Sequence, residues 1–489
     1  MEPENHLVKE RINKLAKIRA LGVNPYPSRF ERTHSSSDIK KEFEKLNKEE
    51  DSGKEVGIAG RIITTRSMGK ASFFNVQDES GQIQVYIRED EAGNAYAVFR
   101  ECDNGDFVGI KGGVFRTKTG ELTIRVKSFE LLSKSLRPLP EKYHGLKDME
   151  LKYRKRYLDL ISSPESKEVF VKRSRMLKAI RDFLAQRGFM EVETPALHPI
   201  YGGAAAKPFV THHNELDMKL YLRISPELYL KRLLVGGFEK IYDINKNFRN
   251  EGIDTTHNPE FTMMEIYQSY ADYDDMMKLT EELYEFIAKT VLGTTKIQFK
   301  GALIDVKAPW ERVKMLDAIQ EYAGVDARNM SAEQLLEIVK KNGIEMKNEP
   351  NWGNLVCAIF EHFCEKEFVN PTFVIDHPAE STPLCKQTKY DSRLVERFEP
   401  FSMGMELANG YSELNDPLLQ RRLLEAQQKQ LTAGNEEANP LDEDFIEAIE
   451  QGMPPAGGVG IGIDRMIMLI LGKESIRDII LFPTMKIVQ

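Results

Sequence analysis

The 489-residue chain has only four cysteines, and no two of them form a Cys-x-x-Cys pair. Closely spaced cysteines are typical of zinc sites and disulfide frameworks, and these are far apart. Cys102, Cys357, Cys364 and Cys385 are therefore expected to be reduced thiols that serve in packing.

Long apolar runs are also missing. No stretch approaches the ~18 uninterrupted apolar residues that a membrane-spanning helix needs, so no membrane association is expected. Residues 1–22 carry charges throughout, with neither the apolar centre of a signal peptide nor the composition of a transit peptide. The predicted location is cytoplasmic.

An excess of positive charge is the third absence, because 68 lysines and arginines face 76 acidic residues, a net charge of -8. A chain of this charge is not a general nucleic-acid binder, so any contact with nucleic acid must be local. The length and the hydrophobic fraction of 41% are enough for sizeable cores. At roughly 100–200 residues per domain, they predict two to four domains.

The pattern along the chain predicts a helical segment, a small barrel and one large unit. Residues 56–135 alternate as five short strands with a helix between the third and fourth, which is the order of an OB-fold. Such barrels commonly bind single-stranded nucleic acid, although a barrel without a ligand fits the pattern nearly as well. The predicted divisions are a helical segment at 1–55, the barrel at 56–135, a proline-bearing linker at 136–164, and a unit at 165–489 with a helical insertion at about 310–366.

Two neighbouring strands carry the first candidate site. Alternation in KIYDINKNFRNEG (240–252) places Asn245, Asn247 and Arg249 on one face. In FTMMEIYQSY, the same period places Phe261, Met263, Glu265 and Tyr267 on one face. A hairpin of the two strands would present a guanidinium for a phosphate or carboxylate and a ring for a base. A surface hairpin with an Arg249–Glu251 salt bridge is an equal alternative.

Two further segments contain chemistry-bearing residues. In PPAGGVGIGIDR (454–465), glycines alternate before Asp464 and Arg465. The glycines could leave a groove for a flat ligand, and Arg465 could bind a polyphosphate. Alternatively, the glycines could serve only close packing. FEPFSMGMELANGYSELND (398–416) contains Glu399, Glu406 and Glu413. Carboxylates near a polyphosphate suit Mg²⁺, and a solvated acidic loop is the alternative.

In order and spacing, these segments resemble the three motifs of the class II aminoacyl-tRNA synthetases: a helix followed by GFMEVETP, FRNEG…HNPEF, and GVGIGIDR. GGAAAKPF (202–209), SPELYLKRL (225–233), FRNEGIDTTHNPEFTMMEIY (248–267) and ANGYSELND (408–416) resemble the lysine-specific family. The resemblance covers nearly the whole chain. It implies an α+β fold, in which an N-terminal OB-fold anticodon-binding barrel precedes a catalytic domain with an antiparallel sheet flanked by helices.

The resemblance also implies roles for particular residues, with Arg249 and Arg465 as the catalytic pair. The implied ATP-binding residues are Arg249, Glu251, His257, Asn258, Phe261, Glu399, Glu406, Gly462 and Arg465, of which Glu399 and Glu406 would be the Mg²⁺ ligands. The implied lysine-binding residues are Gly203, Glu227, Arg249, Glu265, Tyr267, Asn409, Tyr411 and Glu413. The implied anticodon-binding residues are Arg61, Phe73, Gln84 and Glu121.

The implied activity is that of a lysine–tRNA ligase, which makes lysyl-adenylate from L-lysine and ATP and then lysylates tRNA(Lys). A homodimer through the helix at 165–187 is also implied. The chain departs from the family pattern at Lys207, Tyr411 and Val459, which concerns affinity rather than the reaction class. Two rivals are a relative that aminoacylates a protein, which would lack the barrel, and an RNA-binding protein on an inactive scaffold, which would lack the motif residues.

Overall fold

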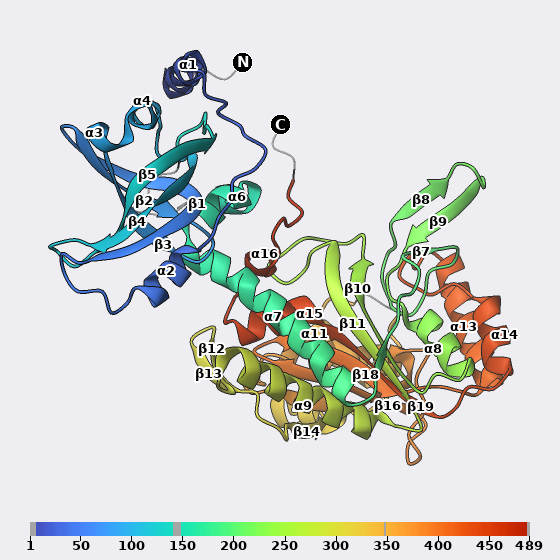
Figure 1. The fold of residues 1–489 in the computed structure, drawn as a ribbon. Helices are drawn as coiled ribbons and strands as arrows, with labels where there is room; N and C mark the ends of the chain where they lie inside the picture. The colour runs from blue at the N-terminus through green and yellow to red at the C-terminus, as the bar shows by residue number, and fades with distance from the viewer. Residues whose placement is uncertain (1–5, 140–147, 347–348, 487–489) are drawn as a thin grey trace. The chain divides into compact units, whose positions relative to one another are not determined.

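The computed structural model describes residues 6–139, 148–346 and 349–486 (Figure 1). The chain divides into two compact units, residues 1–146 and 147–489. Residues 140–147 of the predicted linker lie outside the described part. Among the described helices, none is both long and apolar enough to cross a bilayer.

The first unit is a closed five-stranded barrel with strand order β1-β2-β3-β5-β4. Two short helices lie between β3 and β4, so the predicted strand order of an OB-fold is confirmed. The first strand begins at Asp51, inside the segment that was predicted to be helical. The bounds are α1 (His6–Ala20), α2 (Ser36–Glu42), β1 (Asp51–Met68), β2 (Ala71–Gln77), β3 (Gln82–Arg88), α3 (Glu89–Ala92), α4 (Asn94–Arg100), β4 (Phe107–Arg116) and β5 (Leu122–Ser133).

Alternation of side chains closes this barrel around an apolar core. In β2, Phe74 and Val76 are buried, whereas Phe73 and Asn75 on the opposite face are half-buried. Ile18 of α1 and Ile39 of α2 pack against the same core. The strands therefore leave one outward face for polar and aromatic side chains.

The second unit is built on a mainly antiparallel sheet with the order β14-β15-β16-β18-β19-β11-β10-β6, and β17 pairs with β16. Only the pairs β14–β15 and β6–β10 are parallel. This agrees with the predicted antiparallel sheet flanked by helices. The bounds are β6 (Met190–Glu191), β10 (Lys240–Phe248), β11 (Glu260–Ser269), β14 (Glu311–Lys314), β15 (Thr372–Pro378), β16 (Leu394–Ser402), β17 (Met405–Glu406), β18 (Ala408–Ser412) and β19 (Ala456–Gly462).

The two faces of β11 have different surroundings. Met264 and Ile266 belong to the main apolar core together with α7 (Pro164–Gln186), α9 (Tyr273–Leu292) and α15 (Ile463–Ile470). Tyr267 packs instead with α8 (Glu227–Val235) and α14 (Glu443–Glu450). Since successive side chains of a strand alternate, the residues at 261, 263, 265 and 267 face away from the main core.

The remaining elements lie outside this sheet, although residues 297, 299, 304, 476 and 479 of three of them belong to the main core. The predicted helical insertion begins with β14 and continues with three helices, which share a second apolar core with Val374 of β15 and Leu394 and Phe401 of β16. Within the segment GFMEVETP, residues 190 and 191 form the short strand that pairs with β10. The other bounds are α5 (Met149–Arg154), α6 (Arg156–Ser162), β7 (Leu197–His198), β8 (Val210–His213), β9 (Met218–Leu222), β12 (Lys296–Phe299), β13 (Ala302–Asp305), α10 (Met315–Ala323), α11 (Ala332–Lys341), α12 (Trp352–Phe363), η1 (Ala379–Ser381), α13 (Pro417–Thr432) and α16 (Ile476–Ile479).

Candidate active site

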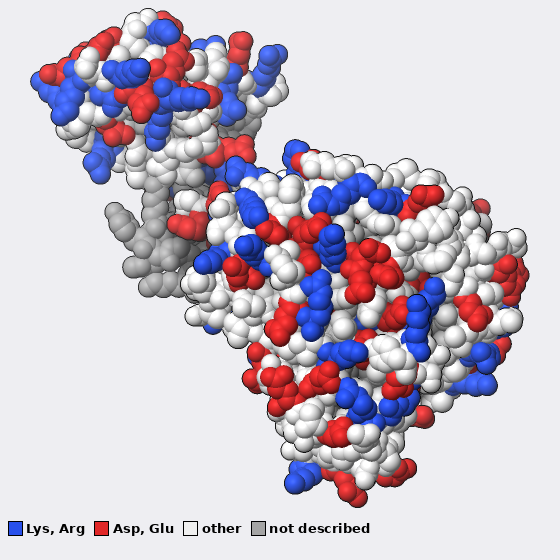
Figure 2. All heavy atoms as spheres, turned by 90° about the horizontal axis from the view of Figure 1, so that it is seen from below, with Lys and Arg blue, Asp and Glu red and all other residues white. Residues whose placement is uncertain are grey.

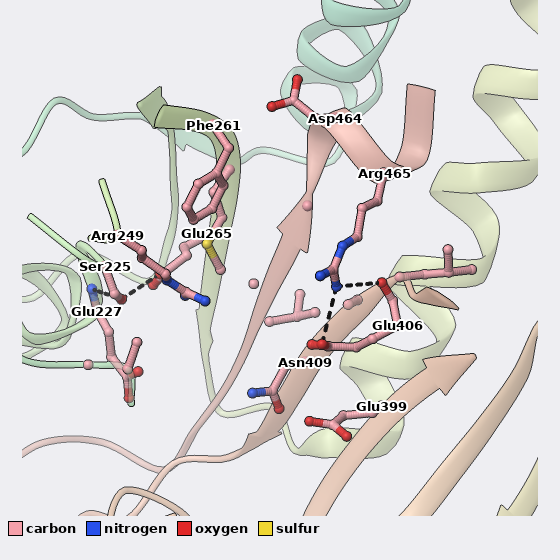
Figure 3. A pocket seen from close by; sticks show the side chains of 18 of the residues that line it. Ser225, Glu227, Arg249, Phe261, Glu265, Glu399, Glu406, Asn409, Asp464 and Arg465 are labelled. Carbon is pink, nitrogen blue, oxygen red and sulfur yellow. Dashed lines mark hydrogen bonds and ion pairs between the residues drawn. The ribbon is translucent and has the colours of Figure 1, made fainter. Parts of the chain in front are cut away.

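One cavity of about 370 Å³ in the second unit collects the candidate residues of the catalytic segments (Figure 3). It lies over the outward face of β11, β18 and β19, and the loop between β10 and β11 forms part of its wall. All sixteen residues that the sequence singled out for ATP, lysine and Mg²⁺ line it. They are Gly203, Glu227, Arg249, Glu251, His257, Asn258, Phe261, Glu265, Tyr267, Glu399, Glu406, Asn409, Tyr411, Glu413, Gly462 and Arg465.

Arg249 and Phe261 form one wall of the cavity. The backbone N–H of Arg249 donates to the carbonyl of Pro259 at 2.9 Å, which fixes the residue just beyond the end of β10. Its guanidinium carbon lies 5.2 Å from the centre of the Phe261 ring. Arg249 Nε is buried and has no hydrogen-bond partner, and burial lowers the pKa of the side chain. No described ion pair joins Arg249 to Glu251, so the salt-bridged hairpin is not what forms.

Arg465 lies at the start of α15 and reaches toward β17 (Figure 3). Its Nη1 donates to the carbonyl oxygen of Glu406 at 3.1 Å and to Glu406 Oε2 at 3.3 Å. Its Nη2 lies 3.0 Å from Nε2 of His257, whose Nδ1 lies 2.8 Å from Asp254 Oδ2. The guanidinium of Arg465 thus joins α15 to Glu406 and to His257 of the loop between β10 and β11.

Asn258 occupies the cavity wall with both ends of its amide engaged. Its Nδ2 donates to the carbonyl of Glu260 at 2.6 Å, and its Oδ1 accepts from the backbone N–H of Thr484 at 3.2 Å. Asn258 therefore holds the loop in shape from within. Glu251 and His257, which also line the cavity, are exposed to solvent.

Glu399 and Glu406 come from a tight hairpin rather than from one continuous strand. After β16 the chain reverses at Met403 and Gly404, both with positive φ, and the register places Glu406 opposite Phe401. This reversal explains how two acids of opposite parity line the same cavity. Arg397 forms an ion pair with Glu399 and donates from Nε to Asn409 Oδ1 at 3.0 Å.

The far end of the cavity is acidic and deeply buried. Glu265 accepts from Ser225 Oγ at 2.6 Å and from the hydroxyl of Tyr267 at 3.1 Å. Burial, and then repulsion from Glu227, raise the pKa of Glu265 to about 8. Ionising a buried carboxylate is costly, which favours the protonated form of Glu265.

A second pair of acids completes this end. The hydroxyl of Tyr411 donates to Glu227 Oε1 at 2.5 Å. Burial raises the pKa of Glu413 to about 8, despite the attraction of Lys231. A Cβ added to Gly458 would lie 2.0 Å from Glu413 Oε1, so this glycine gives the carboxylate its space. Gly203, at φ +85°, would likewise place a Cβ 2.8 Å from Glu227 Cβ.

Sequence reasoning missed several residues that shape the cavity. Asp464 was noted without a role; it accepts from Arg173 of α7 at 2.7 Å and from the backbone N–H of Thr262 at 2.8 Å, so it ties α15 to β11. Ser225 and Arg397 hold two of the acids. The segment SPELYLKRL contained Ser225, but the role of Arg397 depends on strand pairing that no local pattern reveals.

The four barrel residues lie on neighbouring strands of the first unit. Arg61, Phe73 and Gln84 lie on β1, β2 and β3, and Glu121 precedes β5. The guanidinium of Arg61 lies 4.2 Å from the ring centre of Phe107 and donates to the carbonyl of Gly105 at 2.8 Å. The remaining contacts are Phe73 to Tyr86, with ring centres 4.8 Å apart, and Gln84 Nε2 donating to Thr123 Oγ1 at 3.0 Å.

Charge on the surface is mixed rather than segregated. Figure 2 shows lysines and arginines interspersed with acids over the displayed face of the second unit. Among the described residues, no group of three or more His, Cys, Asp or Glu side chains could hold a metal ion by itself. Any Mg²⁺ at Glu399 and Glu406 would therefore need ligands from a bound substrate.

Comparison with known proteins agrees with this geometry. Residues 148–486 match the family described as tRNA synthetases class II (D, K and N), and residues 56–132 match the OB-fold nucleic acid binding domain. The chain is 55% identical over 484 residues to a lysine–tRNA ligase of Carboxydothermus hydrogenoformans, covering 99% of this chain and 98% of the relative.

Two further relatives carry the same description. The chain is 54% identical over 489 residues to a lysine–tRNA ligase of Pelotomaculum thermopropionicum, covering 99% of this chain and 96% of the relative. It is 50% identical over 489 residues to that of Bacillus subtilis, covering 99% and 98%. With a fold, a cavity and full-length relatives in agreement, the chain belongs to the class II tRNA synthetases (D, K and N), among the lysine–tRNA ligases.

Proposed function

We propose that this enzyme activates L-lysine with ATP and transfers the lysyl group to the 3′ end of tRNA(Lys). The observation that carries the proposal is the division of one cavity into two ends. Three buried carboxylates and two phenols lie at one end, and three arginines, an aromatic ring and four further acids line the rest of the cavity. A diamino acid fits the first end, and a nucleoside triphosphate fits the second.

Lysine would lie with its charged groups on separate partners. Glu227, beside Gly203, receives the α-ammonium group, and Arg249 receives the carboxylate. The ε-ammonium reaches Glu265, Tyr267 and Glu413, while Asn409 and Tyr411 line its path. A neutral amino acid would leave buried carboxylates without a partner, which is a strong basis for rejecting it.

ATP would bind across β10 and β11 and the start of α15. The adenine stacks on Phe261, and the α-phosphate meets Arg249, whose free Nε supplies an unused donor. Arg465 grips the far phosphates from the N-terminal end of its helix. His257, Glu251 and Asn258 shape the loop over the nucleotide, and Gly462 leaves room beside Arg465.

The site fits Mg²⁺ by the chemistry of its donors. Glu399 and Glu406 supply hard carboxylate oxygens next to the proposed phosphate position, and Mg²⁺ typically takes one or two carboxylates together with substrate phosphates and water. When bound, the ion would neutralise phosphate charge. Arg397 and Arg465, which hold Glu399 and Glu406, keep these two acids in place.

The chain's own contribution to the first reaction is positioning and charge stabilisation. Arg249 holds the lysine carboxylate close to the α-phosphorus, which the carboxylate oxygen attacks as pyrophosphate departs. Arg249 and Arg465 stabilise the negative charge that gathers on the phosphate oxygens. In the second reaction, a terminal ribose hydroxyl of tRNA attacks the carbonyl of lysyl-adenylate and AMP leaves.

The barrel would read the anticodon. Phe73 supplies a ring on which an unstacked base can lie, and Arg61, Gln84 and Glu121 supply groups for base edges.

The catalytic unit would pair with a second copy of the chain, and this homodimer would use α7. Sedimentation at micromolar concentration tests the dimer, and a monomeric active enzyme would contradict it.

Pyrophosphate exchange into ATP, measured with each of the twenty amino acids, tests the function. Exchange with lysine that requires Mg²⁺, followed by lysylation of tRNA, is the expected result. Exchange with a different amino acid would mean that the acidic end is misassigned. RNA binding without any exchange would favour an inactive scaffold.

A further inference from the structure

A lysine of the chain itself is buried behind the acidic end of the cavity. Lys231 follows Glu227 by four residues on α8, so the two side chains lie on one face of the helix. Lys231 Nζ lies 2.7 Å from Glu227 Oε1 and 2.5 Å from Glu413 Oε2. The side chains of Lys231 and Glu413 are fully buried, so this ion pair is shielded from water.

All three donors of this ammonium group have partners within the chain. Besides the two carboxylates, Nζ donates to the carbonyl of Leu384 at 3.5 Å. Lys231 does not line the cavity. It therefore acts on a substrate only through the carboxylates that it holds.

The acid that Lys231 holds has one oxygen left for a ligand. Among the described residues, neither carboxylate oxygen of Glu413 has a hydrogen-bond partner; Oε2 forms a buried ion pair with Lys231 Nζ, and Oε1 does not. The backbone of Glu413 is fixed, because its N–H donates to the carbonyl of Ala456 at 2.8 Å. A fixed, buried and half-satisfied carboxylate next to a cavity is a receptor for a cation.

Counting charges at this end gives a simple result. Glu227, Glu265 and Glu413 contribute three negative charges when ionised, and Lys231 contributes one positive charge. The remainder is two negative charges, which equals the number of ammonium groups on lysine. Arg249 separately matches the substrate carboxylate.

We propose that Lys231 is a positioning residue that sets the charge of the amino-acid pocket to match a substrate with two ammonium groups, an inference that rests on the proposed function. It neutralises one carboxylate equivalent and fixes Glu227 and Glu413. A substrate with a single ammonium group leaves one buried carboxylate unpaired. Selection of a diamino acid then depends on a residue that does not touch it.

Other ionisable groups around Glu413 do not change this count. Tyr267 of β11 and Tyr411 of β18 face the acids, and burial raises the pKa of both phenols well above the ordinary value. Cys385, which forms a β-bridge with Glu413, has its thiol pKa raised well above the ordinary value by burial. All three are neutral, and the more distant Arg397 is paired with Glu399.

The test compares Lys231→Met, Glu413→Gln and the double variant in pyrophosphate exchange. Each single change moves the pocket charge away from two negative charges, to three for Lys231→Met and to one for Glu413→Gln. Each is expected to raise KM for lysine about tenfold or more while kcat changes less, because buried pairs are broken. The double variant restores two negative charges, so its KM is expected to be lower than that of either single variant.

Two further readouts separate charge from structure. 6-Hydroxynorleucine has one ammonium group, and Glu413→Gln should gain activity on it relative to lysine. Thermal unfolding checks the fold of each variant, and Glu413→Gln keeps the test valid if Lys231→Met does not fold. A double variant no better than the worse single variant would overturn the proposal, whereas absence of lysine exchange in the unaltered enzyme would overturn the proposed function instead.

Discussion

Each of the two units buries a lysine between two carboxylates, and the two clusters differ in how completely they are satisfied. In the barrel, Lys134 Nζ lies 2.5 Å from Asp103 Oδ2 and 2.8 Å from Asp106 Oδ2. The other oxygens of these acids are also used, because Ser135 N–H donates to Asp106 Oδ1 at 2.7 Å and Lys14 donates to Asp103 Oδ1 at 2.7 Å. In the catalytic unit, neither oxygen of Glu413 has a hydrogen-bond partner among the described residues, and only Oε2 has an ion pair, with Lys231.

The pKa values follow this difference. Although burial acts to raise it, hydrogen bonds from Lys134 and Lys14 leave the pKa of Asp103 below its ordinary value. Burial raises the pKa of Glu413 to about 8 in spite of Lys231. A closed cluster contributes to folding, whereas an open cluster keeps interaction energy unused until a ligand supplies the missing charge.

In the catalytic unit, the largest effect is expected from Arg249→Ala. Among the described residues, Arg249 Nε has no hydrogen-bond partner and the guanidinium contacts the Phe261 ring, so the fold should lose little when the side chain is removed. Lysine-dependent pyrophosphate exchange should fall about 1000-fold or more, because charge on the reacting phosphate loses its main donor. The melting temperature should stay unchanged. Arg181→Ala, which removes an exposed ion pair with Glu191, is the matched control, and equal losses in both variants would refute the assignment.

The closed cluster of the barrel is tested by Lys134→Met. Removing Lys134 leaves Asp106 without its cation and Asp103 with Lys14 as its remaining lysine, and is expected to destabilise the barrel by about 3–5 kcal/mol. Hydrogen exchange of peptides from β1 and β4 measures this loss. Lys127→Met, at an exposed pair with Glu55, should cost less than about 1 kcal/mol. If Lys134→Met altered KM for lysine instead, the two clusters would not differ in kind.

The dependence on pH should have opposite signs in the two clusters. Glu265 and Glu413, with pKa values raised to about 8, bind protons in the empty pocket that the unfolded chain has already lost above its ordinary value of 4.5. Their contribution to stability therefore falls as pH rises from about 4.5 to 8. The lowered pKa of Asp103 gives stability that is lost as pH falls through the acid range below its ordinary 3.8.

Lysine binding should sharpen that contrast by releasing protons. Its ammonium groups require ionised carboxylates, so KM for lysine should fall by up to about tenfold per pH unit for each proton released between pH 6 and 8 and level off above pH 8. Calorimetry in buffers of different ionisation enthalpy counts the protons released. A KM that is flat across this range would contradict the open cluster.

Much of this architecture follows from local sequence pattern. The parts that do not follow from it are determined by contacts between residues far apart in the sequence. Alternation was enough to place Phe261, Glu265 and Tyr267 on the same face of one strand. The barrel strand order also followed from turns and period. The reversal that brings Glu406 beside Glu399 depends on positive φ at Met403 and Gly404, which a pattern of alternation does not predict.

The open cluster itself could not be predicted from the sequence. Lys231 in SPELYLKRL has the spacing of an ordinary exposed helical pair with Glu227. Its burial is decided by Leu384 and Glu413, which are more than 150 residues away in sequence. Local spacing identifies which side chains share a face, but only the packed fold decides which charges are removed from water.

The smallest expected effect concerns the barrel's outer face, where binding would use an aromatic platform instead of an unsatisfied charge. Phe73 is half-buried against Tyr86, with ring centres 4.8 Å apart, so one side of the ring is already used. Phe73→Ala should raise KM for tRNA about tenfold, near the lower end of what one stacked base contributes. Pyrophosphate exchange should be unchanged, because no described residue of the barrel lines the catalytic cavity. Tyr26→Ala, an exposed aromatic before the barrel, is the control, and an equal rise in both variants would show that the effect is not specific to the Phe73 ring.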